Sequence, residues 1–246
     1  MAMKINRKHF DTIDSTNTWA KQQAPTFERN AITLVTAGTQ TAGRGRFNRV
    51  WVSPPNQNIY ATFCFFIEKH RTDIGNLPQI MALSAAKMME NLGFKPKLKW
   101  PNDVLLSNKK VAGILCETTP FSDQLCVILG IGINVNMPCE VLEKIDRPAT
   151  SLLVEGGNSL DVEQVLEALQ GEFVESLDIY MNEGFYPFLE PYKAHMVHSE
   201  GDQLKFHDNR KVWEGAFQGI NTDGTLNVKL ANGEIRTFVA GEILPE

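Results

Sequence analysis

Residues 125–136 read LCVILGIGINVN, and this stretch decides the fold. Its apolar side chains fall on the odd positions, whereas the later even positions hold Gly130, Gly132 and Asn134. Successive side chains of a β-strand point to opposite faces of the sheet, so one face of this strand must contribute to a core. The other face carries Gly130 and Gly132, which we call the glycine floor. Glycine weakens a strand, so two glycines on one face indicate the close approach of a ligand or of another backbone.

Shorter runs of β-branched and aromatic residues predict further strands around this one. These strands cover residues 5–10, 32–36, 59–67, 97–100 and 110–117, with a hairpin turn at 107–109. Apolar residues at helical spacing and capping signals predict helices as well. The helices begin after Ser15, at Leu77 and after Asp161, and an irregular one covers 184–196. The pattern predicts an α+β fold, a mixed β-sheet with flanking helices on one face.

The pattern of the chain changes near residue 198. Short strands are predicted at 203–206, 212–217, 226–229 and 235–239, separated by Asp-Asn, Asp-Gly and Asn-Gly turns. Strands of this length and spacing predict a small β-barrel of about 50 residues. We therefore expect one domain at residues 1–196 and a second at 197–246.

Composition excludes several classes of function. The net charge is −5, and an acidic balance argues against DNA or RNA as the main partner, because neutralising phosphates requires a basic face. The N-terminus has no apolar run typical of a signal peptide, and no apolar stretch is long enough to span a membrane. The four cysteines lack CxxC spacing, which favours free thiols. These features predict a cytoplasmic protein without a membrane partner.

A glycine loop with two arginines, Gly43-Arg44-Gly45-Arg46, is the clearest candidate for chemistry. Glycine lets the backbone turn tightly beside a ligand, and arginine presents a planar cationic fork that suits carboxylates and phosphates. The sequence lacks the GxxxxGK[ST] and GxGxxG nucleotide fingerprints, the HExxH metal motif and the GxSxG serine elbow. Arginine, lysine and asparagine side chains must therefore supply the chemistry, which indicates an anionic small molecule as ligand.

Four groups of residues, in this order, resemble the motifs of biotin–protein ligases. They are Asp14-Ser15-Thr16-Asn17 with Gln40, residues 42–46 with Trp51, Lys99-Trp100-Pro101-Asn102-Asp103, and residues 110–115 with 130–134. The resemblance covers about residues 10–246 and implies the class II synthetase-like biotin ligase fold followed by an SH3-like β-barrel. It also implies the monofunctional type, because motifs that start within about fifteen residues of Met1 leave no room for an N-terminal DNA-binding domain.

The resemblance implies an AMP-forming ligation in two steps. Biotin and MgATP would give biotinyl-5′-adenylate and pyrophosphate, and the biotinyl group would then pass to a lysine of a biotin carboxyl carrier domain. Two like charges about 4 Å apart repel by roughly 4 kcal/mol at an effective dielectric of about 20, so cations must offset this repulsion. Arg44, Arg46 and Lys110 are the catalytic candidates. An edge strand of the sheet could pair with the carrier or with a second copy, giving a homodimer.

The resemblance also implies a role for each residue of the site. The residues that would hold biotin and its adenylate are Ser15, Thr16, Asn17, Gln40, Gly43, Arg44, Gly45, Arg46, Trp51, Lys110, Gly113, Gly130, Gly132 and Asn134. Lys110 would bridge carboxylate and phosphate, and Asn134 would lie near the adenine or the phosphate. Asp103 is the candidate for the magnesium ion or for the acceptor lysine. Asn48 stands where many family members have glycine, and asparagine tolerates a positive φ.

Two other functions stay open from the sequence. A lipoate or octanoate–protein ligase has a related fold, although the GRGR and KWPND residues favour biotin. A nonenzymatic sensor of biotin adenylate that acts as a DNA-bound regulator belongs to a different class. The net negative charge and the missing DNA-binding domain count against it.

Overall fold

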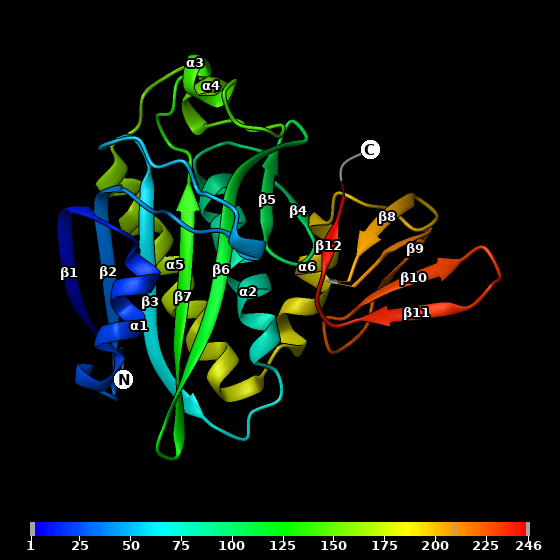
Figure 1. Ribbon diagram of the computed structural model, residues 1–246, viewed down its shortest axis with the longest axis horizontal. Coiled ribbons are helices and arrows are strands. Elements are labelled where there is room, and N and C mark those ends of the chain that lie inside the picture. Colours follow the sequence, from blue (N-terminus) through cyan, green and yellow to red (C-terminus); the bar gives the residue numbers. More distant parts are fainter. Residues whose placement is uncertain (1–2, 209, 245–246) are drawn as a thin grey trace.

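The computed structural model describes residues 3–208 and 210–244, so residues 1–2, 209 and 245–246 of the two predicted domains lie outside the description. A seven-stranded sheet, in the order β1-β2-β3-β7-β6-β5-β4, forms the centre of the larger part. A second sheet, from the C-terminal part, lies beside its β4 end (Figure 1). The strands of the first sheet are β1 (Lys4–Ile13), β2 (Ala31–Gln40), β3 (Ile59–Glu68), β4 (Lys97–Lys99), β5 (Asp103–Leu106), β6 (Lys109–Phe121) and β7 (Gln124–Ile133).

Helices connect and cover these strands. The α-helices are α1 (Thr16–Gln23), α2 (Leu77–Asn91), α3 (Cys139–Leu142), α4 (Leu152–Gly156), α5 (Val162–Glu183) and α6 (Leu189–His195). Short 3-10 helices are η1 (Ala24–Thr26), η2 (Arg46–Asn48), η3 (Ile74–Asn76) and η4 (Tyr186–Phe188). The irregular helix predicted at 184–196 is thus η4 followed by α6, because Gly184 ends α5 with a φ of 73°. Within the described residues, no helix is both long enough and apolar enough to cross a membrane.

The first sheet is mixed, as predicted. Strands β1 and β2 pair in parallel, with α1 on the connection between them. The other neighbouring strands of this sheet pair antiparallel. The hairpin turn expected before β6 is present, since Ser107 and Asn108 have φ values of 48° and 60° and join β5 to β6.

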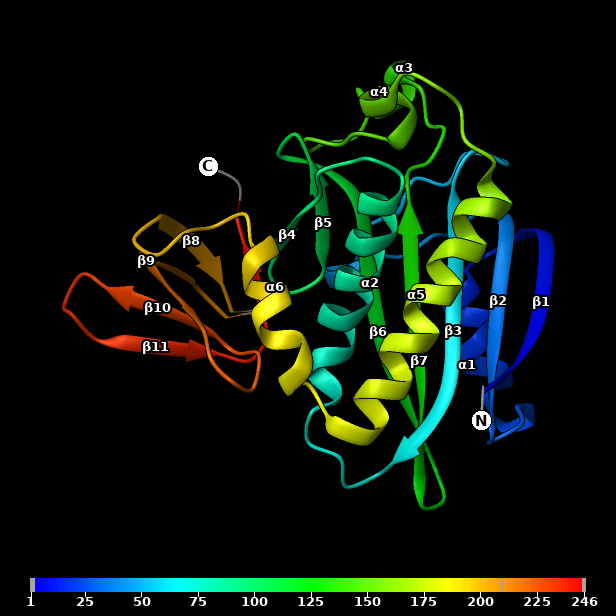
Figure 2. The same ribbon diagram turned by 180° about the vertical axis from the view of Figure 1, so that it is seen from behind.

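The main core lies between this sheet and the pair α2 and α5. The odd positions of β7 are buried there, as the alternation predicted: Val127, Leu129 and Ile131 are at most 3% exposed. Phe173 of α5 packs edge-on against Phe63 of β3, with ring centroids 4.9 Å apart. Figure 2 shows both helices lying across this face of the sheet.

The prediction that helices cover one face of the sheet is wrong, because α1 covers part of the opposite face (Figure 1). Ala20 of α1 packs in a second apolar cluster with Cys64, Cys126 and Ile128. The reason lies in β7 itself. Its even positions are apolar at Cys126 and Ile128 and become glycine further along the strand. The apolar half of this face needs cover, and α1 provides it.

The C-terminal part forms an open five-stranded sheet in place of a closed barrel. Its order is β11-β10-β9-β8-β12, so β11 and β12 are its two edges. The strands are β8 (Gln203–His207), β9 (Val212–Ile220), β10 (Leu226–Leu230), β11 (Ile235–Phe238) and β12 (Glu242–Ile243). The sequence predicted the first four but missed β12, which is two residues long. After β11 the chain turns through Gly241, at a φ of 147°, and β12 pairs with β8.

A buried turn fixes the C-terminal sheet to the first one. The carbonyl oxygen of Gly224 accepts hydrogen bonds from Gln79 Nε2 at 2.8 Å and from Trp100 Nε1 at 2.9 Å. Asn76 Nδ2 donates to the neighbouring Asp223 carbonyl oxygen at 2.9 Å. All three donor side chains are at most 6% exposed. Because buried hydrogen bonds are costly to leave unmade, the turn holds the two sheets in a fixed arrangement.

Gly224→Ala should weaken this attachment. Residue 224 has a φ of 79°, and a Cβ there would overlap Asn76 Nδ2 and lie 2.5 Å from Gln79 Oε1. Gly233→Ala is the matched control, since it has a φ of 86° and nothing within 4 Å of the added Cβ. Chemical denaturation should show that Gly224→Ala lowers the free energy of unfolding by about 2 kcal/mol more than the control does. Equal losses in the two variants would show that the buried turn does not hold the sheets together.

Candidate functional site

A cavity of about 410 Å³ opens on the face of the first sheet that carries α1. Across it lies a loop, residues 43–51, which we call the arginine hairpin. A hydrogen bond of 2.9 Å from Trp51 N to the Gly43 carbonyl oxygen and a β-bridge between Arg44 and Val50 close this hairpin. Every residue of the predicted binding set lines the cavity except Gly43, and Asp103 lines it too.

Gly43 lies at the base of the hairpin instead. A Cβ at this position would lie 2.6 Å from the Trp51 carbonyl oxygen, 2.8 Å from Ser53 Oγ and 3.0 Å from Gln40 Nε2. Glycine is therefore needed here for the two ends of the hairpin to approach each other.

The sheet register builds the floor of the cavity. Gly132 of β7 lies opposite Tyr60 of β3 on one side and opposite Gly113 of β6 on the other. Gly113 in turn pairs with Asp103 of β5, and Asp103 pairs with Lys99 of β4. One cross-strand row thus places two charged residues directly beside two glycines.

A β-bulge turns Lys110 toward this row. The β5–β6 register shifts by one residue between Val104 and Leu105, so Leu105 pairs with Lys110 while Val104 pairs with Ala112. Without the shift, Lys110 would face away from Gly113, because side chains alternate along a strand. With the shift, Lys110 Nζ lies 2.6 Å from Asp103 Oδ1.

The backbone and the neighbouring glycine keep Lys110 in place. Lys110 N donates to the Pro148 carbonyl oxygen at 3.0 Å, and Thr150 N donates to the Lys110 carbonyl oxygen at 2.9 Å. The Lys110 side chain lies on Gly113, where a Cβ would be 2.8 Å from Cε and 2.9 Å from Nζ. Lys110 can reach Asp103 in this way because residue 113 has no side chain.

Two side chains lie directly on the glycine floor, where the sequence indicated the close approach of a ligand or of another backbone. A Cβ on Gly130 would overlap Asn17 Oδ1, and a Cβ on Gly132 would overlap the Trp51 indole. The glycines therefore admit the amide and the indole against the sheet. The indole, with Lys110 Nζ 5.6 Å from its centre, forms a flat wall that ends the cavity.

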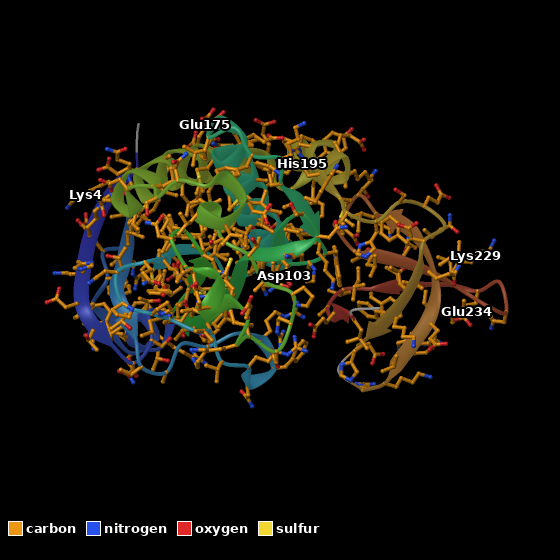
Figure 3. The ribbon with its side chains drawn as sticks, turned by 90° about the horizontal axis from the view of Figure 1, so that it is seen from above. Lys4, Asp103, Glu175, His195, Lys229 and Glu234 are labelled. Atoms are coloured by element: carbon orange, nitrogen blue, oxygen red, sulfur yellow. The ribbon has the colours of Figure 1, made fainter. Side chains whose placement is uncertain are left out.

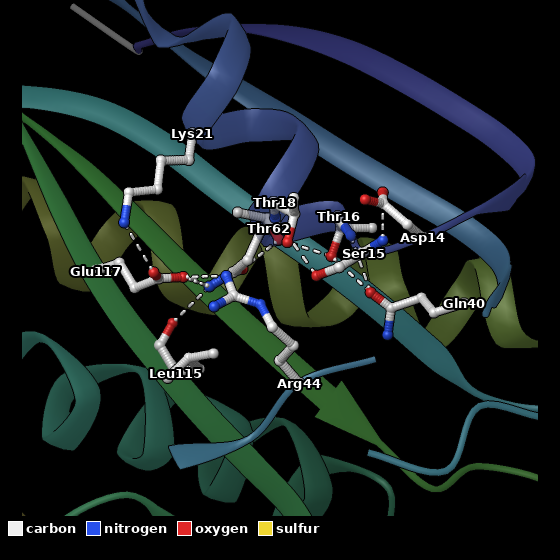
Figure 4. A network of polar contacts seen from close by, with 11 residues as sticks. Asp14, Ser15, Thr16, Thr18, Lys21, Gln40, Arg44, Thr62, Leu115 and Glu117 are labelled. Carbon is white, nitrogen blue, oxygen red and sulfur yellow. Dashed lines mark hydrogen bonds and ion pairs between the residues drawn. The ribbon is translucent and has the colours of Figure 1, made fainter. Parts of the chain in front are cut away.

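The start of α1 is tied to the end of β2. Ser15 caps the helix, with its Oγ accepting from Thr18 N at 3.4 Å. Gln40 Oε1 accepts from Thr16 N at 2.9 Å and lies 3.2 Å from Thr16 Oγ1. The hydroxyl of Thr62, a residue the sequence did not single out, lies 2.8 Å from Thr16 Oγ1 and 2.7 Å from Asn17 Oδ1. Figure 4 shows this network, and Ser15, Thr16, Asn17 and Gln40 of it line the cavity.

Glu117 of β6 fixes Arg44, and sequence reasoning missed it. Its carboxylate pairs with Arg44 Nη2 at 2.7 Å and with Lys21 Nζ at 3.2 Å, and accepts from Asn17 Nδ2 at 3.3 Å (Figure 4). Burial acts to raise the pKa of Glu117. The hydrogen bonds from Lys21 and Asn17 and the charges of Arg44 and Lys21 outweigh burial, so this pKa lies below its usual value. The sequence did contain a signal for Glu117. It is an acidic residue in a strand with many apolar residues, and it faces the same side of the sheet as Gly113.

Arg46 reaches into the other end of the cavity. Its Nη1 donates to Asn102 Oδ1 at 2.8 Å, and Asn102 Nδ2 donates to the Ile114 carbonyl oxygen at 2.8 Å. Burial lowers the pKa of Arg46, although a guanidinium stays charged in proteins. Burial also lowers the pKa of Lys99, against the opposing charge of Asp103. Asn102 and Lys99 were part of the KWPND signal but were not assigned a role.

Asn134 uses its amide to hold a loop at the cavity wall. Its side-chain Nδ2 donates to the Thr150 carbonyl oxygen at 2.9 Å, and its backbone carbonyl oxygen accepts from Leu152 N at 3.0 Å. The same loop supports Lys110 through Thr150. Asn134 therefore acts on the shape of the cavity, besides lining it.

The tip of the arginine hairpin has a strained backbone. Asn48 has a φ of 58°, the positive value that the asparagine was expected to tolerate. Phe47 has a φ of 56° as well, which is uncommon for an aromatic residue. The sequence indicated that Asn48 could tolerate a positive φ, whereas the positive φ of Phe47 had no signal in the sequence.

The cavity is cationic although the chain is acidic. Seven cationic side chains and three acidic ones line it, a difference of four positive charges in a chain with a net charge of −5. The cationic residues are Arg44, Arg46, Arg49, Lys99, Lys110, Lys144 and Arg147, and the acidic ones are Asp103, Asp146 and Glu242. Such a site favours an anionic ligand.

Two family models match the chain. Residues 9–134 match the biotin/lipoate A/B protein ligase family, and residues 203–244 match the biotin protein ligase C terminal domain. The first match includes the arginine hairpin, Lys110 and the glycine floor. The second includes most of the C-terminal sheet.

Individual proteins are similar over most of their length. The chain is 32% identical over 227 residues to a biotin–[acetyl-CoA-carboxylase] ligase of Paracoccus denitrificans, covering 87% of this chain and 90% of that protein. It is 30% identical over 240 residues to the bifunctional ligase/repressor BirA of Bacillus subtilis, covering 94% and 72%. The structure of the biotin protein ligase from Aquifex aeolicus in complex with biotin and ATP superimposes with a TM-score of 0.81, at 30% identity and 97% coverage of both chains. The chain therefore belongs to the biotin/lipoate A/B protein ligase family.

Proposed function

We propose that this chain is a biotin–protein ligase, which forms biotinyl-5′-AMP from biotin and ATP and transfers the biotinyl group to a carrier lysine. The observation that carries the proposal is the cationic cavity with Lys110 held on a glycine floor beside Asp103. Its relatives support the choice of substrates. One similar protein is named as a ligase that attaches biotin to acetyl-CoA carboxylase, and a similar structure contains biotin and ATP.

The chemistry of the first step explains why the cavity is cationic. A carboxylate oxygen of biotin attacks the α-phosphorus of ATP, and the bond to the pyrophosphate oxygen breaks. Two anions must come together, and preorganised cations in a partly closed site lower the barrier. We assign this role to Lys110, Arg44 and Arg46. Asp103 and Glu117 hold Lys110 and Arg44 in position before any ligand arrives.

In the second step, an amine must reach the carboxyl carbon of the biotinyl group. The ε-amine of the carrier lysine attacks the acyl carbonyl of the adenylate, AMP leaves, and the amine loses a proton. We propose that Asp103, at the cavity wall, contacts the acceptor lysine of the carrier in this step. The polar groups of Ser15, Thr16, Asn17 and Gln40 would hold biotin, and Trp51 would form the apolar wall beside it.

Magnesium would enter with ATP. Among the described residues, no group of three or more His, Cys, Asp or Glu side chains is arranged to hold a metal ion. Mg²⁺ commonly binds one or two carboxylates together with substrate phosphates, and Asp103 fits that pattern as a single carboxylate. The ion would offset phosphate charge.

We further propose that the reaction takes place in the cytoplasm on a biotin carboxyl carrier protein. The division at residues 196 and 197 separates the catalytic part from the C-terminal part in this proposal. It falls between α6 and β8, next to the bridge between Leu98 and Met196 that covers the outer edge of β4.

Purified protein should biotinylate an apo carrier domain. With biotin and MgATP, mass spectrometry should show the carrier gaining the mass of one biotinyl group. Lipoic acid in place of biotin should give no product. A mass increase with lipoic acid alone would instead make the chain a lipoate ligase, and no increase with either acid would reject both ligase functions.

Lys110→Ala should slow adenylate formation by about 100-fold or more, because it removes a preorganised charge from the site. Pyrophosphate release in the absence of carrier measures this step. Lys109→Ala is the control, since Lys109 is the exposed neighbour on the same strand. Equal rates for the two variants would take Lys110 out of the mechanism.

The ion pairs of Glu117 with Arg44 and Lys21 should be lost at acidic pH. Because the pKa of Glu117 is lower in the folded protein, its contribution to stability is fully present above the unfolded pKa of about 4.3. It is lost as the pH falls through the folded pKa. Glu117→Gln should therefore lower the free energy of unfolding most near neutral pH, with the difference from wild type shrinking below about pH 4. Glu28→Gln, which alters a fully exposed pair with Lys4, should change stability little at any pH. A pH-independent effect of Glu117→Gln would contradict the assignment.

A further inference from the structure

The tip of the arginine hairpin contacts the C-terminal sheet, although Arg46 and Gly241 are 195 residues apart in the sequence. Arg46 Nη2 donates to the Gly241 carbonyl oxygen at 2.6 Å. The Arg49 guanidinium forms an ion pair with the Glu242 carboxylate. Glu242 lines the cavity as well, so the contact lies at its edge.

Phe47 adds an aromatic contact between the two arginines. Its ring lies edge-on to the His207 imidazole, with centroids 6.5 Å apart. The guanidinium carbons of Arg46 and Arg49 lie 4.8 Å and 5.7 Å from the centre of the Phe47 ring. His207 and Glu242 are paired across β8 and β12, so all the tip contacts fall on one place in the C-terminal sheet.

The part of the C-terminal sheet that the hairpin tip contacts is held rigidly by its own neighbours. A Cβ on Gly241 would overlap the Phe206 ring and lie 2.6 Å from the His207 carbonyl oxygen, so the backbone at 241 is packed tightly on β8. The same sheet is attached to α2 and Trp100 through the Gly224 carbonyl oxygen. The hairpin tip therefore contacts a fixed surface.

The ion pair carries the part of this contact that depends on charge. Glu242 faces Arg49, Arg46 and Lys99, and it is the acidic partner that the Arg49 hydrogen bond uses. The side chains of Arg49 and Glu242 are 37% and 21% exposed, so the pair is partly shielded from water. Removing the Glu242 charge would leave Asp103 as the carboxylate that still acts on all three cations, which weakens the attraction that holds the hairpin closed.

We propose that Arg49 and Glu242 form a latch by which the C-terminal sheet holds the arginine hairpin closed over the reactive adenylate. Both are positioning residues, acting through the hairpin. The inference rests on the proposed biotin ligase function, and it gives the C-terminal sheet a role in retaining the intermediate. An adenylate that escapes reacts with any amine. The amine attacks the acyl carbon and AMP leaves, so escape is visible as label on bystander proteins.

The test compares Glu242→Gln with Glu234→Gln. Glu234 also pairs with an arginine of the C-terminal sheet, Arg236, but at the far end from Asp103 (Figure 3). Each variant is incubated with biotin and MgATP, and bystander albumin and an apo carrier are assayed for biotin. Glu242→Gln should label albumin about fivefold faster than wild type for each pyrophosphate released. Glu234→Gln should match wild type.

A double-mutant cycle isolates the pair. Arg49→Gln should also raise albumin labelling about fivefold, and the double variant Arg49→Gln/Glu242→Gln should be no worse than either single variant. Multiplied effects in the double variant would mean that the two residues act separately, and they would overturn the latch. Wild-type retention of the adenylate by Glu242→Gln would overturn it too.

A second readout is independent of biotin. Trypsin, acting on the protein alone, should cleave after Arg46 about fivefold faster in Glu242→Gln than in Glu234→Gln, because the hairpin spends more time open. Equal cleavage would reject the latch. If wild-type protein fails to biotinylate the carrier while Glu242→Gln still shows faster cleavage, the proposed function fails and the latch stands.

Discussion

The alternation of side chains along β7 is the constraint on which the rest of the structure depends. Its odd positions are buried under α2 and α5, so its even positions must face the other way. Cys126 and Ile128 on that side are apolar and are covered by α1. Gly130 and Gly132 leave the sheet surface bare, and the cavity forms there. One strand therefore sets both the position of the core and the position of the site.

The site is built by placing charges on this bare surface with little freedom to move. Lys110 reaches it because a bulge shifts β6 by one residue, and Asp103 then fixes its amine. Arg44 is held by Glu117, which lies on the same strand as Lys110 but further along it. These carboxylates limit the mutual repulsion of the cations in a partly buried cavity, where unpaired like charges would cost stability. The lining retains an excess of positive charge, which suits a ligand bearing phosphate.

Local patterns made much of this predictable from the sequence. The strand predicted from Leu125, the turn at Ser107 and Asn108 and the cap at Ser15 each depend on a few neighbouring residues, and each is present, although the strand ends at Ile133 and not at Asn136. The gathering of the predicted residues around one cavity followed from the resemblance more than from any single motif. The helix on the second face was missed because the glycines in the later half of β7 were taken to represent its whole even face, although Cys126 and Ile128 are apolar.

The other features that the sequence did not predict depend on pairing between residues that are far apart in the chain. Glu242 lies in a two-residue strand and joins the site only because β12 pairs with β8, a choice that depends on the whole C-terminal sheet. The sequence likewise suggested a closed barrel, since strand lengths do not reveal whether the first and last strands meet. The bulge in β6 was hidden for a similar reason, because it is a property of the pairing with β5.

The positive φ of Phe47 gives the hairpin a mechanical property. A bulky residue in the left-handed region costs about 1–3 kcal/mol, which surrounding contacts must offset. The closed hairpin thus stores energy at its tip, where the aromatic ring lies between two arginines and against His207. Loss of those contacts would leave this cost without an offset, so the backbone at Phe47 makes the closed hairpin depend on its contacts with the C-terminal sheet.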